Sequence, residues 1–536
     1  MKFISRRSPV YGRNGMVASS QPLASMAGIK VLQQGGNAAD AAVAVAAALN
    51  VTEPTSTGIG GDCFCLFFDA SGKEVLGING SGSAPTALTL EALAEEGIAG
   101  ERLPSLSVHT VTVPGACAGW VDTIERFGTM EVGEVLALAI ELAEEGFPVE
   151  PLTARGWQRG AARLKSGPHG DEMLIDGRGP GAGEIMRNPT LARTFREVAE
   201  HGKPGFYEGR VAEAVVDILR SFGGTMTLED LEKHRSTFPE PVSTNYRGLE
   251  VYEIPPNGQG ITALIALNIL EEFDISSFEP FSVEHLHTLI EAMRIAFADT
   301  RWYVTDPDVV HVPVEELISK EYAAERRRLL DPERATVDVS RGSPVAGSDT
   351  VYFCTADGEG NACSFINSNY MGFGTGLIPE GCGFTLQNRG ANFSLVPGHP
   401  NVLAPGKRPY HTIIPGMATR DGELFGPFGV MGGFMQPQGH VQVVVNMVDY
   451  RMDPQEALDA PRFCISSGLA GGKVLLEEGI SVDVMSTLAS MGHEVVPRAG
   501  AYRGGFGRGQ IILRNPETGV LCGGSDPRAD GMAIGL

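Results

Sequence analysis

The sequence predicts an α+β protein whose helices and strands form separate layers. Apolar spacing typical of helices dominates residues 118–330, and runs typical of strands dominate after residue 350. Strands also occur in the first part, and the two kinds of element do not alternate as they would in a parallel βαβ fold. With 43% hydrophobic and 20% charged residues, the 536-residue chain has the composition of a globular protein.

The first part begins with two helices and a hairpin. Apolar spacing predicts helices over 22–34 and 37–49, and Asn37 stands where its side chain would cap the second one. Residues 57–80 are typical of a glycine turn followed by a β-hairpin, with Cys63 and Cys65 on one face of its first strand as core residues. Further helices are predicted over 132–146, 188–202, 209–224 and 282–304, and a strand over 249–254.

A polar connection separates this part from the second. Residues 329–348 contain prolines and glycines and indicate an exposed segment. Beyond it, strands are predicted over 351–357, 361–366, 411–419 and 424–430, followed by a helix over 437–450.

Charge and hydropathy exclude several classes of partner. The formal net charge is −23, so we expect neither a nucleic acid nor an anionic membrane surface, since both bind basic proteins. No stretch approaches the roughly 20 apolar residues of a spanning helix, and the N-terminus lacks the apolar core of a secretory signal. Eight cysteines in so long a chain do not suggest a disulfide framework. We therefore expect a cytoplasmic protein.

Motifs for nucleotide and metal binding are weak. There is no G-x-x-x-x-G-K-[ST] loop, and the glycines of residues 177–184 lack the flanking strand and helix of a dinucleotide site. His285 and His287 lie two apart in a predicted helix, where side chains point away from each other. The sequence therefore predicts no metal and no cofactor.

Gly432 and Gly433 separate a predicted strand from a predicted helix that starts near Pro437. Bare backbone N–H groups beside the positive end of a helix dipole can form an oxyanion hole. The same glycines also suit an ordinary tight turn, and this stretch alone does not separate the two interpretations.

Thr350 opens a predicted strand directly after Asp349. A threonine hydroxyl is a poor nucleophile without a base, and an N-terminal threonine carries a base in its own α-amine. Cleavage of the Asp349–Thr350 bond would expose that amine. The alternative is an ordinary threonine at the start of a strand.

Segments spread from about Gly15 to Gly531 resemble the γ-glutamyltransferase (glutathione hydrolase) family of N-terminal-nucleophile hydrolases. They include "EPTSTGIGGDCF", "YRGLEVYEIPPNGQG", "DTVYFCTADGEGNA", "GKRPYHTIIPGM" and "GVMGGFMQPQGH". "DTVYFC", "SNYMGFG" and "LQNRGANFS" are similar to the acylase-like branch rather than to the transpeptidases. The resemblance implies a four-layer αββα sandwich that is made as an inactive precursor.

By this resemblance the precursor cleaves itself between Asp349 and Thr350. The Thr350 hydroxyl would attack the Asp349 carbonyl, and water would open the resulting ester. Chains 1–349 and 350–536 would stay together as an αβ heterodimer, alone or paired as (αβ)2. The same hydroxyl would then form an acyl-enzyme from a substrate amide, with the α-amine as base.

The resemblance also implies roles for residues around the nucleophile. Gly432 and Gly433 match the family's oxyanion-hole pair. His411 and Thr412 occupy the positions where the transpeptidases hold the γ-glutamyl carboxylate with two serines. Two further substrate-binding candidates are Ser368 and Tyr370.

This chain departs from the transpeptidases where they bind the glutamyl group. Residues 77–85 contain no arginine for the α-carboxylate, Asn392 replaces an aspartate for the α-amine, and Val351 replaces a second threonine. Since a buried carboxylate requires a cationic partner, we expect Arg389 to bind it with its planar guanidinium. The alternative is that Arg389 only braces its loop.

We therefore expect a self-cleaving amide hydrolase for γ-glutamyl compounds. The runner-up substrates are other small acid amides of glutaryl or oxamate type. Alternatives from other classes are a non-processing scaffold protein of the same fold and a nucleotide-dependent enzyme.

Overall fold

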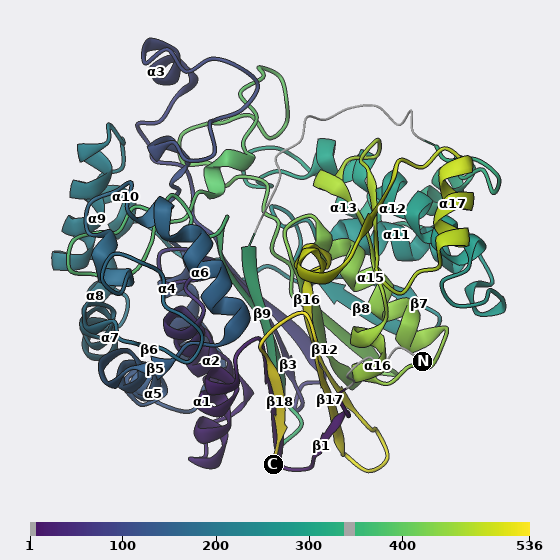
Figure 1. Ribbon diagram of the computed structural model, residues 1–536, viewed down its shortest axis with the longest axis horizontal. Helices are drawn as coiled ribbons and strands as arrows, with labels where there is room; N and C mark the ends of the chain where they lie inside the picture. Colours follow the sequence, from purple (N-terminus) through teal and green to yellow (C-terminus); the bar gives the residue numbers. More distant parts are fainter. Residues whose placement is uncertain (1–6, 337–348) are drawn as a thin grey trace.

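A computed structural model describes residues 7–336 and 349–536 of the chain and has four layers (Figure 1). Two sheets face each other in the centre, and helices cover their outer faces. All strand pairs in these two sheets are antiparallel. The α+β class and the αββα sandwich are thereby confirmed.

One sheet has six strands in the order β18-β2-β9-β10-β3-β4. Their bounds are β2 (Gly15–Ser19), β3 (Asp62–Asp69), β4 (Glu74–Gly80), β9 (Asp349–Asp357), β10 (Ala362–Tyr370) and β18 (Met532–Gly535). Side chains alternate along β3, so Phe64 and Leu66 lie between the sheets while Cys63 and Cys65 face the helices. The predicted shared face of the two cysteines is confirmed, and all eight cysteines are free thiols.

The other sheet has seven strands in the order β1-β17-β16-β12-β11-β8-β7. Their bounds are β1 (Val10–Gly12), β7 (Val242–Tyr246), β8 (Leu249–Glu253), β11 (Gly416–Arg420), β12 (Glu423–Met431), β16 (Arg508–Arg514) and β17 (Leu521–Ser525). An apolar core between the two sheets includes Tyr352, Met417 and Ile512.

Helices of the first part cover the six-stranded sheet (Figure 1). They are α1 (Pro22–Gln33), α2 (Ala38–Thr52), α4 (Ala116–Phe127), α5 (Val132–Glu145), α6 (Pro151–Leu164), α7 (Pro189–His201), α8 (Pro204–Tyr207), α9 (Gly209–Ser221) and α10 (Leu228–Glu232). Every residue of α2 is buried, because its many alanines allow close packing on both sides. Asn37 caps α2 as predicted, and Asp40 completes a capping box.

The seven-stranded sheet is covered by α11 (Ile261–Glu271), α12 (Val283–Tyr303) and α15 (Met435–Val448). Smaller helices are α3 (Leu90–Glu95), α13 (Val314–Leu317), α14 (Lys320–Arg327), α16 (Pro454–Asp459) and α17 (Val482–Ser490), with 3-10 turns at η1 (Val108–Thr110), η2 (Gly170–Met173), η3 (Ile275–Ser277), η4 (Arg389–Asn392), η5 (Ser466–Gly468) and η6 (Gly500–Phe506). Short strands outside the main sheets are β5 (Phe147–Pro148), β6 (Ile185–Met186), β13 (Phe463–Ile465), β14 (Val474–Glu477) and β15 (Val495–Arg498).

One predicted strand is wrong over half its length. Residues 411–419 do not form a continuous strand: His411 makes an isolated bridge to Gly258, and β11 begins only at Gly416. Pro415 has no N–H to contribute to a ladder, so the regular pairing starts after it.

Both sheets take strands from either side of the Asp349–Thr350 bond. In the six-stranded sheet, β2, β3 and β4 come from residues 1–349, and β9, β10 and β18 come from residues 350–536 or include Asp349. The two segments therefore share one compound domain. Part of the predicted connection 329–348 lies outside the described residues. Among the described residues, no helix is long and apolar enough to cross a membrane.

Candidate active site

Thr350 lies near the start of β9, a central strand of the six-stranded sheet, and is fully buried in the uncleaved chain. Along β9, Val351 and Phe353 pack against the helices, whereas Tyr352 lies between the sheets. Because side chains alternate along a strand, Thr350 shares the face of Tyr352 and points into the space between the sheets.

Ser368 contacts the Thr350 hydroxyl. The two hydroxyl oxygens, Thr350 Oγ1 and Ser368 Oγ, lie 3.0 Å apart. Ser368 Oγ also accepts hydrogen bonds from Tyr370 N–H at 2.8 Å and from Arg389 Nη2 at 3.1 Å. The Ser368 oxygen is thereby held in place from two sides, and either of the two hydroxyls can donate the hydrogen bond between Thr350 and Ser368.

A β-bulge creates this contact. Ser368 and Asn369 both stand opposite Thr350, where a regular ladder would place one residue. The next residue, Tyr370, has a φ of 74°, in the left-handed region. Bulges redirect side chains and are frequent beside active sites, and this one aims Ser368 at Thr350.

Arg389 begins η4 and connects the predicted substrate-binding segments. Its Nη1 donates to Thr412 Oγ1 at 2.7 Å and its Nη2 donates to Ser368, while its guanidinium carbon lies 4.6 Å from the centre of the Tyr370 ring. Complete burial lowers the pKa of Arg389 to about 10, and the negative charge of Asp62 opposes that shift. The guanidinium thus stays charged at neutral pH.

These contacts favour the bracing role of Arg389 over direct binding of a substrate carboxylate. Both Nη groups have hydroxyl partners, the charge is offset by Asp62, and the side chain has no exposed surface. Arg389 holds Ser368, Tyr370 and Thr412 in one arrangement around Thr350.

His411 is hydrogen-bonded to Asp62 in the interior. His411 Nε2 lies 3.0 Å from Asp62 Oδ2, and Asp62 Oδ1 accepts hydrogen bonds from two backbone N–H groups and from Gln387. Burial raises the pKa of Asp62 to about 6, which Arg389 opposes. Burial, with Arg389 adding to the effect, lowers the pKa of His411 well below its usual value. At neutral pH the neutral imidazole of His411 therefore donates a hydrogen bond from Nε2 to the Asp62 carboxylate.

The Gly432–Gly433 turn joins β12 to α15. Gly432 has a φ of 136° and Gly433 a φ of 59°, conformations that residues with a Cβ rarely adopt. Within the described part of the chain, neither N–H donates a hydrogen bond. Two unpaired N–H groups just before a helix N-terminus are what an oxyanion hole requires.

Gln259 links this turn to the neighbouring segment, and the sequence analysis did not identify it. Its Nε2 donates to the carbonyl oxygens of Thr412 at 2.6 Å and Gly433 at 2.9 Å, and its Oε1 accepts from the Tyr410 hydroxyl at 2.9 Å. Gln259 and Asp62 lie in the segments "YRGLEVYEIPPNGQG" and "EPTSTGIGGDCF", which carry the family resemblance. That is the signal that could have found them.

The predicted site residues are thus brought together to different degrees. Direct contacts join Thr350, Ser368, Tyr370, Arg389 and Thr412. Gly433 joins them through Gln259. Asn392 lies at their edge, where it lines a cavity of about 600 Å³ together with Tyr410.

The Asn392 amide faces this cavity with hydrogen-bonding capacity to spare. Its Oδ1 and Nδ2 are buried, and neither makes a hydrogen bond of good geometry with a described residue. Burial raises the pKa of the nearby Tyr370 hydroxyl, and the Asn392 amide is one of the groups that oppose this shift. The cavity therefore offers a polar ligand an amide beside the nucleophile network.

A larger cavity of about 920 Å³ contains none of the predicted site residues. Seven arginines line it, of which Arg508 is paired with Glu53, and Arg503 and Arg528 are paired with Glu477. The smaller cavity, which shares Asn392 and Tyr410 with the site, is the better candidate for a substrate.

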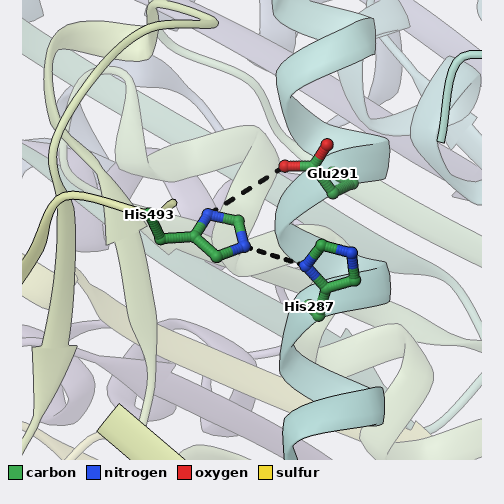
Figure 2. A group of neighbouring side chains, drawn as sticks. All are labelled: His287, Glu291 and His493. Carbon is green, nitrogen blue, oxygen red and sulfur yellow. Dashed lines mark hydrogen bonds and ion pairs between the residues drawn. The ribbon is translucent and has the colours of Figure 1, made fainter. Parts of the chain in front are cut away.

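The histidines of α12 have different partners, as their spacing predicts. His285 Nδ1 accepts a backbone N–H, whereas His287 faces His493 from the second part of the chain (Figure 2). His287 Nδ1 lies 2.8 Å from His493 Nε2, and its Nε2 lies 2.7 Å from the Asp331 carbonyl oxygen. Glu291, one turn further along α12, has Oε1 4.0 Å from His493 Nδ1.

His287, Glu291 and His493 are all buried and are close enough together to be considered for a metal ion. Arg294 already supplies a positive charge there, with Nε 3.4 Å from Glu291 Oε1. The absence of a metal stays a prediction that a chelator can test.

Known proteins resemble this chain over nearly its whole length. A family model described as Gamma-glutamyltranspeptidase matches residues 24–536. A glutathione hydrolase-like proenzyme of Bacillus subtilis (strain 168) is 37% identical over 98% of this chain and 99% of the relative. An acylase proenzyme of Pseudomonas sp. (strain V22) is 36% identical over 100% of this chain and 96% of the relative. The solved structure of a cephalosporin acylase from Bacillus halodurans has a TM-score of 0.93 and 46% identity, covering 100% of this chain and 98% of that one.

Proposed function

The chain belongs to the gamma-glutamyltranspeptidase family, and we propose that Thr350 is the nucleophile with which it first cleaves itself and then hydrolyses amides of small carboxylic acids. It is an amide hydrolase made as a proenzyme, related to glutathione hydrolases and acylases. The position of the cleavage site, the residues that act and the class of acid are the proposal.

The contact between Thr350 and Ser368 is the observation that carries this proposal. A nucleophilic oxygen has to be held in one orientation, and Ser368 is itself held by Tyr370 N–H and Arg389. An ordinary threonine at the start of a strand needs no such arrangement. The N–H groups of Gly432 and Gly433, which donate to no described residue, supply the second requirement, a site for negative charge.

Self-cleavage follows from an attack by the Thr350 hydroxyl on the carbonyl carbon of Asp349. The new C–O bond replaces the C–N bond, the hydroxyl proton passes to the departing nitrogen, and an ester results. Water then hydrolyses the ester, which leaves a carboxylate on Asp349, a free hydroxyl on Thr350 and a free α-amine at the new N-terminus.

The free α-amine makes the second reaction possible. It accepts the hydroxyl proton as Thr350 Oγ1 attacks a substrate amide, and the charge that develops on the substrate oxygen is stabilised by the N–H groups of Gly432 and Gly433. The amine of the substrate leaves with the proton, and water releases the acid from the acyl-enzyme. If a second amine attacks the acyl-enzyme in place of water, the acyl group is transferred to that amine by the same step.

Specificity for γ-glutamyl compounds has less support than hydrolysis of an acid amide. The segment 77–85 lacks the arginine of the transpeptidases. Arg408 lies against this segment, but it donates to the carbonyl oxygens of Ser81 and Arg235 and is paired with Asp308. We therefore give amides of glutaryl or oxamate type the same standing as γ-glutamyl amides as candidate substrates.

Mass spectrometry of the purified protein tests the first step. We expect two chains, 1–349 and 350–536, without any added protease. Thr350→Ala lacks the attacking oxygen and should remain one inactive chain, and Thr350→Ser should be cleaved more slowly. Cleavage of the Thr350→Ala protein at the same bond would overturn the mechanism, and an uncleaved wild-type chain would favour a scaffold protein of the same fold.

A substrate screen tests the second step. The processed protein is offered γ-glutamyl, glutaryl and oxamate amides, and release of the free amine is measured. Turnover of any of them that is absent from Thr350→Ala supports the proposal, and no turnover by a fully processed protein contradicts it.

A further inference from the structure

Two arginines that have no acidic partner among the described residues line the 600 Å³ cavity that Asn392 and Tyr410 share with the candidate site. Arg102 lies in the loop before η1, and Arg301 lies in the last turn of α12. Within the described residues neither forms an ion pair, and Arg301 Nε is buried without a hydrogen-bond partner.

The carboxylates that line the cavity do not neutralise these arginines. Asp299 accepts two hydrogen bonds from Arg326, at 2.7 and 3.0 Å. Burial and the proximity of Arg301 lower the pKa of Arg102 by more than Glu101 raises it. The pKa of His399, in the same cavity, is lowered by burial and then by Arg301 and Arg102. The cavity is therefore electropositive.

Arg301 is also connected to the turn that is proposed to hold the oxyanion. Its guanidinium carbon lies 5.0 Å from the centre of the Tyr410 ring and 4.5 Å from that of Phe434. Tyr410 donates to Gln259, which holds Gly433, and Phe434 directly follows Gly433. An anion bound by Arg301 would therefore lie next to Tyr410 and Phe434, the side chains that flank this turn.

We propose that Arg102 and Arg301 bind a carboxylate on the acyl part of the substrate and so select monoamides of short dicarboxylic acids. The inference rests on the proposed function of Thr350. A guanidinium group binds a carboxylate with two parallel hydrogen bonds, and the added negative charge removes the repulsion between the two arginines. This pair takes the place of the arginine that is missing from residues 77–85, and Asn392 supplies a neutral donor and acceptor in the same cavity.

The test compares acidic and neutral ligands of equal size in variants of the two arginines. Arg102→Gln, Arg301→Gln and the double variant are prepared in processed form, and Arg301→Lys keeps the charge but not the planar fork. Arg159→Gln is the matched control, since Arg159 lines the larger cavity. The substrates are the p-nitroanilides of glutaric acid and of butyric acid, and glutarate and butyrate are tested as ligands by calorimetry.

We expect the wild-type protein to prefer the glutaryl over the butyryl substrate in kcat/KM. Each Arg→Gln change should reduce this preference about tenfold, mainly through KM, which corresponds to the loss of about 1.4 kcal/mol from one charge-assisted contact. Hydrolysis of the butyryl substrate should change by less than about threefold. Arg301→Lys should be intermediate, and Arg159→Gln should behave as wild type.

Equal losses on both substrates, or an unchanged preference in the double variant, would overturn the inference while leaving the proposed function intact. Calorimetry tests the arginine pair even if the proposed hydrolysis fails, because glutarate binding requires no turnover. Glutarate binding that is lost in the double variant of a processed but inactive protein would support the arginine pair and contradict the proposed hydrolysis. Equal glutarate binding by the wild type and the double variant would contradict the inference on its own.

Discussion

The Thr350 hydroxyl depends on a neighbour that is itself fixed from two sides. Ser368 Oγ receives Tyr370 N–H from its own strand and Arg389 Nη2 from η4. A hydroxyl oxygen that accepts two hydrogen bonds is fixed in position, so Ser368 Oγ stays 3.0 Å from Thr350 Oγ1. These contacts would position the proposed nucleophile at the scale of single atoms before any substrate arrives.

Removal of the Ser368 hydroxyl tests this positioning. We expect Ser368→Ala to slow self-cleavage and to lower kcat, each by about tenfold, the equivalent of one hydrogen bond of about 1 kcal/mol or slightly more. Ser364→Ala is the control, because Ser364 lies on the same strand, is also buried and bonds the Tyr352 hydroxyl at 2.8 Å. The Ser364→Ala variant should be less stable than the wild type but should cleave itself at the same rate. Equal rates for both variants would make Ser368 a structural residue only.

Asp62 predicts a particular pH dependence of stability. Its folded pKa of about 6 lies above the ordinary value of 3.8, so folding favours the protonated form. The stabilisation from this group is complete below about pH 4 and is lost as the pH rises through 6, in total about 2–3 kcal/mol. Asp62→Asn cannot titrate. The free energy of unfolding of the variant, relative to its parent, should therefore rise by that amount between pH 4 and 7.

Urea unfolding in a Thr350→Ala background, where both proteins stay as one chain, gives the measurement. The lowered pKa of His411 acts with the opposite sign, since its stabilisation is lost as the pH falls. The same comparison in a His411→Gln background removes this contribution, because His411 Nε2 contacts Asp62 Oδ2 directly. Parallel pH profiles for the two proteins would show that Asp62 keeps its ordinary pKa.

At the scale of elements, the strand–turn–helix unit from β12 to α15 supplies what a single residue cannot. β12 packs across the sandwich against β9, so the turn at its end comes to the region where β9 begins. The first N–H groups of α15 carry the positive end of its dipole, and the glycines leave the backbone uncovered. The orientation of the N–H groups in the turn and the positive charge beside them therefore arise from the whole strand–turn–helix unit.

Gly433→Ala should lower kcat by about 10²–10³-fold, the effect of losing one oxyanion donor. The reason is that an alanine at a φ of 59° is strained by about 1–2 kcal/mol, and relief of this strain turns the N–H away. Gly422→Ala is the matched control, because Gly422 has a φ of 79° in the β11–β12 turn with open space around it. Both variants should lose similar stability, measured by thermal unfolding. Full activity in folded Gly433→Ala would reduce the turn to a structural role.

The sequence was informative about elements and less so about contacts between them. Asn37 and the period of 37–49 predict α2 because capping and apolar spacing are local properties. Thr350 and Gly433 were found through ordered motifs. The bulge that aims Ser368, the bridge made by Gln259 and the unpaired state of Arg301 are different, since each depends on residues more than a hundred positions apart or on irregular pairing. No local pattern records such contacts.

At the scale of the whole molecule, cleavage cannot separate the two segments without opening both sheets. β9 lies between β2 and β10, so each segment contributes strands to the middle of the same sheet. We expect the processed protein to melt in one transition whose Tm rises with protein concentration, because unfolding then releases two chains. Thr350→Ala, as one chain, should show no such dependence. A concentration-independent Tm for the processed protein would mean that the chains remain associated after unfolding.

The His287–Glu291–His493 cluster is a buried polar contact between the two segments, and it gives the last prediction (Figure 2). His493→Gln removes the partner of His287 Nδ1 and leaves polar groups unsatisfied, at a cost of about 1–3 kcal/mol. In a protein of this size we expect a fall in Tm of a few degrees and a higher concentration for half-dissociation of the processed chains.

His109→Gln is the control for this variant, because His109 is also buried but its carboxylate partner, Glu96, belongs to the same segment. It should lower Tm without promoting dissociation. EDTA should leave the wild-type Tm unchanged, because Arg294 already supplies the positive charge beside Glu291. A fall in Tm with EDTA that zinc reverses, and that His493→Gln abolishes, would instead identify the cluster as a metal site that joins the two chains.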